Sequence, residues 1–138
     1  MIDRILDASV AIAWYLPERF SMAAREWRKR FLDQRVRFIV PELHYWEIGN
    51  VLRTYVRRGE LDRELALEIY DTHLAAPLEV IAPNRETVLS TAMEYGATVY
   101  DSVYISLALK LDVPLLTAER TTTPWVVKLG EKVDIVRE

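Results

Sequence analysis

The feature that most constrains the fold is the alternation of short, β-prone apolar runs with longer segments of helical periodicity. The apolar runs are RILDAS at 4–9, RFIVP at 37–41, LEVIAP at 78–83, PLLT at 114–117 and VDIV at 133–136. Strands that alternate with helices pair in parallel through right-handed crossovers. The sequence therefore predicts an α/β fold, with a small parallel sheet of four or five strands flanked by helices in a three-layer α/β/α arrangement.

Capping and turn residues mark the ends of the predicted helices. Ser21 and Asp62 stand where a helix begins, Asn84 caps another, and Gly59 and Gly96 follow the last helical residues. Helices are therefore expected over residues 10–16, 21 to about 32, 41–58, 62–76, 84–95 and 98–111. The stretch TTTPWVVKLG at 121–130 has no clear pattern and receives no assignment.

Composition narrows the class of protein. A chain of 138 residues, 51% of them hydrophobic and 28% charged, fits one compact domain over residues 1–138. There is no Cys, and His44 and His73 are the only histidines, so no thiolate or His-rich zinc site is expected. The N-terminus MIDRILDAS does not resemble a signal peptide, and no run of about 18 apolar residues occurs. We expect a cytoplasmic protein with no membrane span.

The charge distribution is uneven. A net charge of −3 argues against a protein that binds nucleic acid over its whole surface. Basic residues nevertheless gather in REWRKRFLDQRVR at 25–37 and in RTYVRRG at 53–59. Both stretches are explained either by solvated helix faces or by local contacts to nucleic acid.

Two acidic residues follow predicted strands. Asp7 ends the first strand, and Glu119 follows the fourth strand in LLTAER. Functional groups of open parallel sheets gather at these carboxyl ends of strands. Each residue also has a simpler explanation, Asp7 as the N-cap of the next helix and Glu119 as a polar end to an apolar strand.

Two more acidic residues lie within predicted helices. Asp101 opens its helix and shares an apolar stripe with Tyr104, so it is expected to face inward, unless it is only a first-turn acid favoured by the helix dipole. Glu47 shares a narrow polar stripe with Asn50, which is either a solvent edge or part of a site. Gly49 costs this helix roughly 1 kcal/mol relative to Ala, which predicts a close approach of the helix to the sheet.

The four carboxylates indicate a kind of site if they meet. Carboxylate oxygens without thiols, and with few imidazoles, suit Mg²⁺ or Mn²⁺. Acids that share a pocket repel one another unless a cation is present. A bound metal ion would activate a water and offset charge on a phosphoryl group during hydrolysis.

The order of these motifs resembles the PIN-domain family, and more narrowly the VapC-type ribonuclease toxins of toxin–antitoxin pairs. The resemblance rests on Asp7 with Ser9 two residues on, the acid in YWEIGNVL, the acid in VYDSVYISLA, and LLTAER. It extends from residue 4 to about 136. Each motif is weak alone, whereas the ordered set of four is fairly specific. The resemblance implies an endoribonuclease dependent on Mg²⁺ or Mn²⁺.

The resemblance also implies roles for particular residues. Asp7, Glu47 and Asp101 match metal-binding catalytic acids. Glu119 stands where the family more often has Asp. At this position it would bind a second ion, directly or through water. The small polar positions that support the site or contact phosphate are Ser9, Asn50 and Thr117.

The substrate and partners follow from the same resemblance. They are RNA, a cognate antitoxin protein and a second copy of the chain in a homodimer. Basic residues expected to steer the RNA are Arg53, Arg57, Arg58 and Arg120. Aromatic residues near the site would stack on bases, although the tryptophans are expected mainly in the core. These are Trp14, Trp27, Trp46 and Trp125.

Three other readings compete with this one. A haloacid-dehalogenase-like phosphatase also begins with Asp after the first strand, but it needs a second Asp where Ser9 stands here. A PIN-like module that has lost metal binding and only holds RNA or protein is favoured by the change to Glu119 and disfavoured by the survival of Asp7, Glu47 and Asp101. A purely structural α/β domain explains the acids least well.

Overall fold

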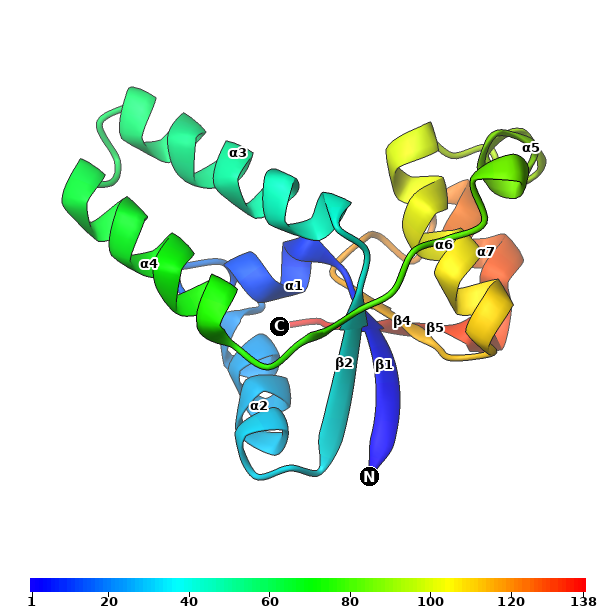
Figure 1. The fold of residues 1–138 in the computed structure, drawn as a ribbon, viewed down its shortest axis with the longest axis horizontal. Helices are drawn as coiled ribbons and strands as arrows, with labels where there is room; N and C mark the ends of the chain where they lie inside the picture. Colours follow the sequence, from blue (N-terminus) through cyan, green and yellow to red (C-terminus); the bar gives the residue numbers. More distant parts are fainter.

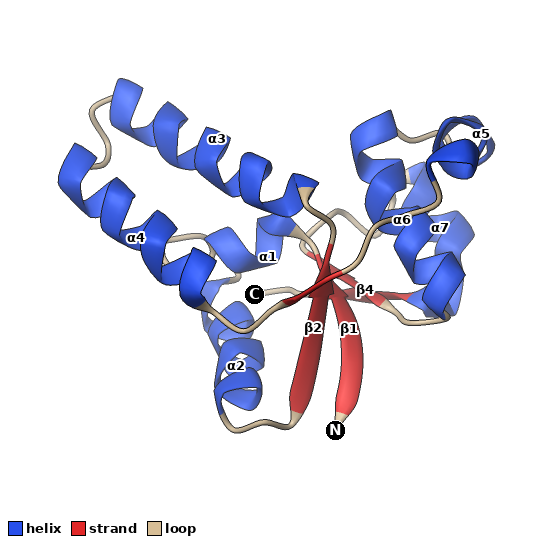
Figure 2. Cartoon of the chain, in the orientation of Figure 1, coloured by secondary structure: helices blue, strands red, loops and turns tan.

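The five predicted strands form one parallel sheet. The protein is described here by a computed structural model that covers all residues, Met1–Glu138. The sheet has the strand order β3-β2-β1-β4-β5, and every neighbouring pair is parallel. Figure 2 shows β1 and β2 side by side. The strands are β1 (Ile2–Leu6), β2 (Val36–Val40), β3 (Glu79–Val80), β4 (Leu115–Thr117) and β5 (Val133–Ile135).

Seven helices cover the two faces of the sheet (Figure 1). The first group is α1 (Ala8–Ile12), α2 (Ser21–Leu32), α3 (Leu43–Arg57) and α4 (Arg63–Ala75). The second group is α5 (Arg85–Tyr95), α6 (Val99–Leu111) and α7 (Pro124–Leu129), followed by a 3₁₀ turn at Gly130–Lys132. The predicted three-layer α/β/α architecture is therefore confirmed. No helix combines the length and the apolar character that a membrane crossing requires.

Alternating side chains of the strands build two hydrophobic cores. Leu6, Phe38 and Leu116 pack with the first group of helices, whereas Ile5 and Leu115 pack with α6 and α7. Successive side chains of a strand point to opposite faces, so each central strand serves both cores. This explains why the central strands are continuous apolar runs.

The pairing register brings two ends of strands together. Leu6 at the end of β1 pairs with Leu116 of β4, and the Asp7 amide donates to the Leu116 carbonyl at 3.0 Å. The residues next in line are Asp7 and Thr117. They therefore lie side by side at the carboxyl edge of the sheet, although 110 positions separate them.

Several local expectations need correction. The unassigned stretch 121–130 contains α7, which begins with Pro124 directly after the N-cap Thr123. Pro fits the first turn of a helix because the missing amide has no partner there. The strand predicted at 78–83 is paired only at Glu79–Val80, and the helix predicted at 10–16 extends from Ala8 only to Ile12.

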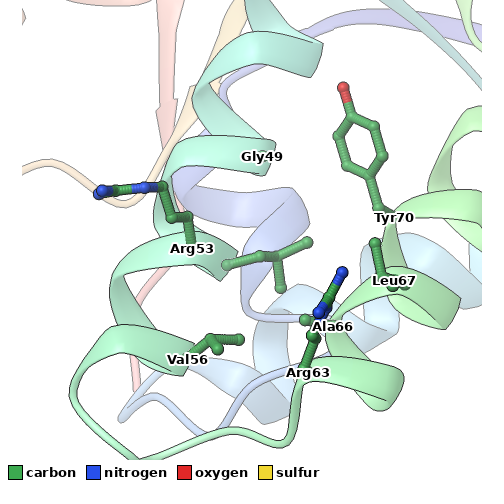
Figure 3. A pocket seen from close by; sticks show the side chains of 8 residues that line it. Gly49, Arg53, Val56, Arg63, Ala66, Leu67 and Tyr70 are labelled. Carbon is green, nitrogen blue, oxygen red and sulfur yellow. The ribbon is translucent and has the colours of Figure 1, made fainter.

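Gly49 makes a different close approach from the predicted one. A Cβ at Gly49 would stand 3.3 Å from Cε1 of Tyr70 on α4, so the glycine faces α4 instead of the sheet. Figure 3 shows Tyr70 standing opposite Gly49 across the space between the two helices. The glycine therefore admits an aromatic ring between α3 and α4.

Candidate active site

Asp7 connects β1 to α1 and points its carboxylate at β4. Its backbone is extended (φ −71°, ψ 145°), as suits an N-cap, but its side chain makes no capping hydrogen bond. Instead Oδ2 accepts hydrogen bonds from the Thr117 hydroxyl at 2.6 Å and the Ser9 hydroxyl at 3.0 Å. Burial raises the pKa of Asp7, and these hydrogen bonds offset the rise only in part. The capping explanation therefore does not account for this side chain.

Ser9 and Thr117 each bind both the Asp7 carboxylate and the loop that follows β4. The Ser9 oxygen accepts from the Ala118 amide at 3.1 Å, and the Thr117 oxygen accepts from the Glu119 amide at 3.2 Å. Each hydroxyl thus donates to the carboxylate and accepts from the backbone. This use of both functions gives the hydroxyls one orientation each.

Glu47 reaches the same region from α3. It is partly buried, and its Oε1 accepts a hydrogen bond of 2.6 Å from the Tyr104 hydroxyl of α6. Burial raises the pKa of Glu47 to about 7, and repulsion from Asp7 and Asp101 adds to the rise, while the Tyr104 hydrogen bond opposes it. A solvent edge of α3 alone therefore does not account for Glu47, which has a hydrogen-bond partner on α6 and acidic neighbours from two other segments.

Asp101 approaches from the first turn of α6. The N-cap residue Thr98 accepts a hydrogen bond from the Asp101 amide at 3.0 Å, which fixes this turn. Burial raises the pKa of Asp101, and repulsion from Asp7 and from Glu119 raises it further. The first-turn explanation alone therefore does not account for Asp101, because the charges of two acids from other segments raise its pKa.

Glu119 is at the edge of the group and has local partners. Its Oε1 accepts from the Arg120 amide at 3.2 Å and from the Thr123 hydroxyl at 3.1 Å. The carboxylate therefore also organises the turn that leads into α7. Its charge still acts on Asp101.

These four carboxylates have no protein cation to balance them. None of them takes part in a salt bridge, and no Lys or Arg is among the causes that set the pKa of Asp7, Glu47 or Asp101. As the side chains stand, no three acidic or imidazole groups are close enough to form a complete metal-binding group. Mg²⁺ usually retains several waters and is bound by only one or two carboxylates, so the donor set fits such an ion.

An open pocket lies beside Glu47. It has a volume of about 340 Å³ and is lined by Leu43, Trp46, Glu47, Asn50 and Tyr100. Trp46 is 60% exposed and Tyr100 is 65% exposed. The expectation that the tryptophans lie mainly in the core is met by Trp14 and Trp125 and is wrong for Trp46.

The four predicted RNA-steering arginines lie in different places. Arg120 follows Glu119 and lines a second open pocket of about 650 Å³ with it. Arg53 is among the residues that line a largely apolar groove between α3 and α4, and its guanidinium points away from Tyr70 (Figure 3). Arg57 and Arg58 end α3, which places them roughly 15 Å along the helix from Glu47.

Sequence reasoning missed Tyr104 and the two histidines as neighbours of the site. Tyr104 donates to Glu47, and its oxygen lies 3.3 Å from Nδ1 of His44, which is completely buried. A Tyr on the apolar stripe of a buried helix was the available signal, because a buried phenol needs a hydrogen-bond partner. Its partner comes from another helix and is not visible in the sequence.

The fold and the acid cluster define a parallel α/β domain with a carboxylate site at the edge of the sheet. Comparison with known proteins agrees, since the PIN domain matches residues 4–121. The chain belongs to the PIN-domain family. It is 31% identical to Ribonuclease VapC3 of Pyrobaculum aerophilum over 120 residues, which cover 84% of this chain and 88% of the relative. The suspected membership of the VapC-type group is thereby confirmed.

Two further similarities support this placement. Ribonuclease VapC1 of Mycobacterium tuberculosis is 34% identical over 85 residues, which cover 57% of this chain and 60% of the relative. The crystal structure of PAE2754 from Pyrobaculum aerophilum superposes with a TM-score of 0.75 at 25% identity, covering 97% of this chain and 84% of that chain. The similarity of fold therefore spans nearly the whole chain.

Proposed function

We propose that this protein is an endoribonuclease that hydrolyses RNA phosphodiesters with Mg²⁺ or Mn²⁺, and that it is the toxin of a VapBC-type toxin–antitoxin pair. The observation that carries the proposal is the group formed by Asp7, Glu47 and Asp101, whose charges act on one another with no protein cation nearby. The ribonuclease names of the curated relatives support the reaction class.

Each carboxylate would have a distinct task. Asp7 and Asp101 would hold the principal ion, with Glu47 as a further ligand or as the group that orients the attacking water. When bound, the divalent ion supplies a water of lowered pKa and positive charge against the phosphate oxygens. Ser9 and Thr117 keep the Asp7 carboxylate in one orientation before any ligand arrives. Glu119 would assist a weaker second ion, directly or through water.

The surface beside the carboxylates fits a single strand of RNA. Trp46 and Tyr100 are exposed aromatic residues that line a pocket together with Glu47 and Asn50. Bases of single-stranded RNA stack on such rings, and amide groups hydrogen-bond to base edges or phosphate. Arg120 is the predicted steering residue nearest to a carboxylate of the group, because it follows Glu119 directly. Arg53, Arg57 and Arg58 would meet only a longer RNA.

The partners are proposed from the relationship to VapC proteins. A cognate antitoxin is expected because such ribonucleases act in pairs with an inhibitor. The homodimer and the cytoplasmic location stay predictions.

One observation favours the alternative, a non-catalytic PIN-like module that binds RNA or protein. No three acidic or imidazole side chains are gathered closely enough to form a complete metal-binding group. The enzyme would cleave RNA when a divalent ion is bound, whereas such a module would bind RNA or protein without cleaving RNA.

The test compares cleavage with binding. A generic single-stranded RNA is incubated with the protein in Mn²⁺, in Mg²⁺ and in excess EDTA, and the products are resolved on a denaturing gel. Cleavage that requires the ion and is lost in Asp7→Asn supports the enzyme. RNA binding without cleavage in either metal supports the alternative, and cleavage that persists in EDTA contradicts the proposed mechanism.

A further inference from the structure

A continuous chain of hydrogen bonds begins at Glu47 and crosses the buried core. The Tyr104 hydroxyl donates to Oε1 of Glu47 at 2.6 Å and lies 3.3 Å from Nδ1 of His44. His44 Nε2 lies 2.8 Å from Nε2 of His73, and His73 Nδ1 lies 2.9 Å from the Tyr15 hydroxyl. Glu47 and Tyr15 are therefore linked through three buried side chains, which come from α6, α3 and α4.

The two imidazoles are confined and neutral. Both histidines are 0% exposed, and His73 packs against the rings of Trp14, Tyr15 and Tyr45 at centroid distances of 5.6–6.0 Å. Burial lowers the pKa of His44 to about 3 and of His73 to about 4. Each ring therefore carries a single proton, on either Nδ1 or Nε2.

The Nε2–Nε2 contact allows only two arrangements of these protons. One ring must donate and the other accept, so the two histidines must be opposite tautomers. In the first arrangement His44 is protonated on Nδ1 and His73 on Nε2. In the second arrangement His44 is protonated on Nε2 and His73 on Nδ1.

The hydrogen bond between Tyr104 and Glu47 selects the first arrangement. The Tyr104 hydroxyl donates its single proton to Oε1 of Glu47. The Tyr104 oxygen then has to be an acceptor towards His44, which requires the proton on Nδ1. In this arrangement Tyr15 donates to His73, His73 to His44, His44 to Tyr104 and Tyr104 to Glu47.

We propose that this one-way chain makes Tyr104 a positioning residue for Glu47, with His44 and His73 holding the Tyr104 hydroxyl in its donating orientation. Because His44 presents a donor, the Tyr104 proton has no other acceptor within reach. This hydrogen bond fixes the position of Oε1 of Glu47. Oε2 has no hydrogen-bond partner in the protein, so it is available to the ion or the water. The role of Glu47 in this inference rests on the proposed function, whereas the direction of the hydrogen-bond chain does not.

Nuclear magnetic resonance of the histidines tests the direction of the chain. The protein contains only two histidines, so long-range ¹H–¹⁵N spectra of the metal-free wild type at pH 8 show two rings. Tyr15→Phe assigns them, because it removes the partner of His73 alone. The expected result is the Nδ1–H tautomer for His44 and the Nε2–H tautomer for His73. The opposite pair of tautomers, equal tautomers, or a charged ring would overturn the proposal.

A pair of Tyr→Phe variants tests the positioning role. Tyr104→Phe keeps the ring in the core and removes the donor to Glu47, whereas Tyr95→Phe removes a hydroxyl that has no hydrogen-bond partner in the protein. Loss of an outer hydrogen bond typically weakens metal binding by about 10–100-fold. Calorimetry should show about tenfold weaker Mn²⁺ binding for Tyr104→Phe and no change for Tyr95→Phe.

The outcomes separate this inference from the proposed function. Wild-type protein that cuts no RNA contradicts the function, while the tautomers and the Mn²⁺ affinity still decide the positioning role. Tyr104→Phe that binds Mn²⁺ as tightly as wild type overturns the positioning role even when RNA cleavage is intact. If the wild type binds no Mn²⁺, the histidine spectra alone decide.

Discussion

The Thr117 hydroxyl donates a 2.6 Å hydrogen bond to the Asp7 carboxylate and so joins the ends of two neighbouring strands. Hydrogen bonds to charged groups contribute roughly 1.5–3 kcal/mol, and this one opposes the rise in the pKa of Asp7 caused by burial. The strands bring the two residues together through the register of β1 with β4. Thr117 therefore supports the Asp7 carboxylate from the neighbouring strand.

Thr117→Val should destabilise the protein and impair the site together. The variant preserves the shape of the side chain but removes the hydroxyl from Asp7, so the free energy of unfolding at pH 7.5 should fall by about 1–3 kcal/mol. Urea unfolding followed by circular dichroism measures this change. Thr117→Ser retains the hydroxyl and should lie near wild type. Equal stability of the Val and Ser variants would show that the hydrogen bond contributes little.

Asp7→Asn and Asp101→Asn should each abolish RNA cleavage, by at least about 100-fold in kcat/KM, without unfolding the domain. Burial raises the pKa of both residues, and repulsion from Asp7 and Glu119 adds to the rise for Asp101, so removal of either charge should leave the thermal midpoint unchanged or higher. Initial rates with a fluorogenic RNA and thermal melts measure the two effects. Asp71→Asn, on the exposed side of α4, is the matched control and should retain full activity. Full activity in either active-site variant would contradict the assignment.

The stability of the metal-free protein should fall as pH rises from 4.5 to 7. Glu47 has a folded-state pKa of about 7 against an ordinary value of 4.5, so the folded protein binds this proton more tightly than the unfolded chain does. The favourable contribution is complete below pH 4.5 and is lost as pH rises to about 7. Thermal melts in EDTA across this range measure it, and Glu47→Gln should flatten the curve.

Addition of Mg²⁺ should reverse that loss. An ion that binds the ionised carboxylates stabilises the folded state, so the rise in thermal midpoint should be larger at pH 8 than at pH 5.5. The comparison needs only melts with and without the ion at the two pH values. An equal rise at both, or none, would mean that the ion does not bind this group.

Glu119→Gln should lower the cleavage rate less than Asp7→Asn, by about tenfold or less. Its Oε1 already accepts from the Arg120 amide and the Thr123 hydroxyl, and an amide oxygen can keep both hydrogen bonds. The remaining effect is the loss of charge near Asp101. Steady-state kinetics of the two variants in parallel measure the ratio, and a larger loss for Glu119→Gln would show that this residue has a central role.

Trp46→Ala should raise the KM for RNA roughly tenfold and leave kcat nearly unchanged. Stacking of one base on an aromatic ring contributes about 1–3 kcal/mol, and Trp46 is exposed beside Glu47. Trp46→Phe should restore most of the affinity. Met93→Ala, an exposed apolar residue on α5, is the control for general loss of surface. A fall in kcat alone would remove Trp46 from the substrate surface.

The sequence by itself determined most of the architecture and the identity of the acids. Periodicity and capping residues predicted the strands and most helices, because these signals are local and strong. Gly96 is an example, since it closes α5 in the left-handed conformation at φ 64°. The ordered positions of Asp7, Glu47, Asp101 and Glu119 pointed to the family, which the match over residues 4–121 shows.

Only the tertiary structure decided which side chains meet. The donor to Glu47 is Tyr104, which lies 57 positions away, and Tyr104 lies against a histidine pair that links α3 to α4. Gly49 makes its close approach to Tyr70 of α4 and not to the sheet. Trp46 is exposed, although tryptophans are usually buried. Local patterns specify which face of an element is apolar, but packing specifies its neighbours. A hydrogen bond between distant residues, and the pKa that results, therefore has no signature in the sequence of either partner.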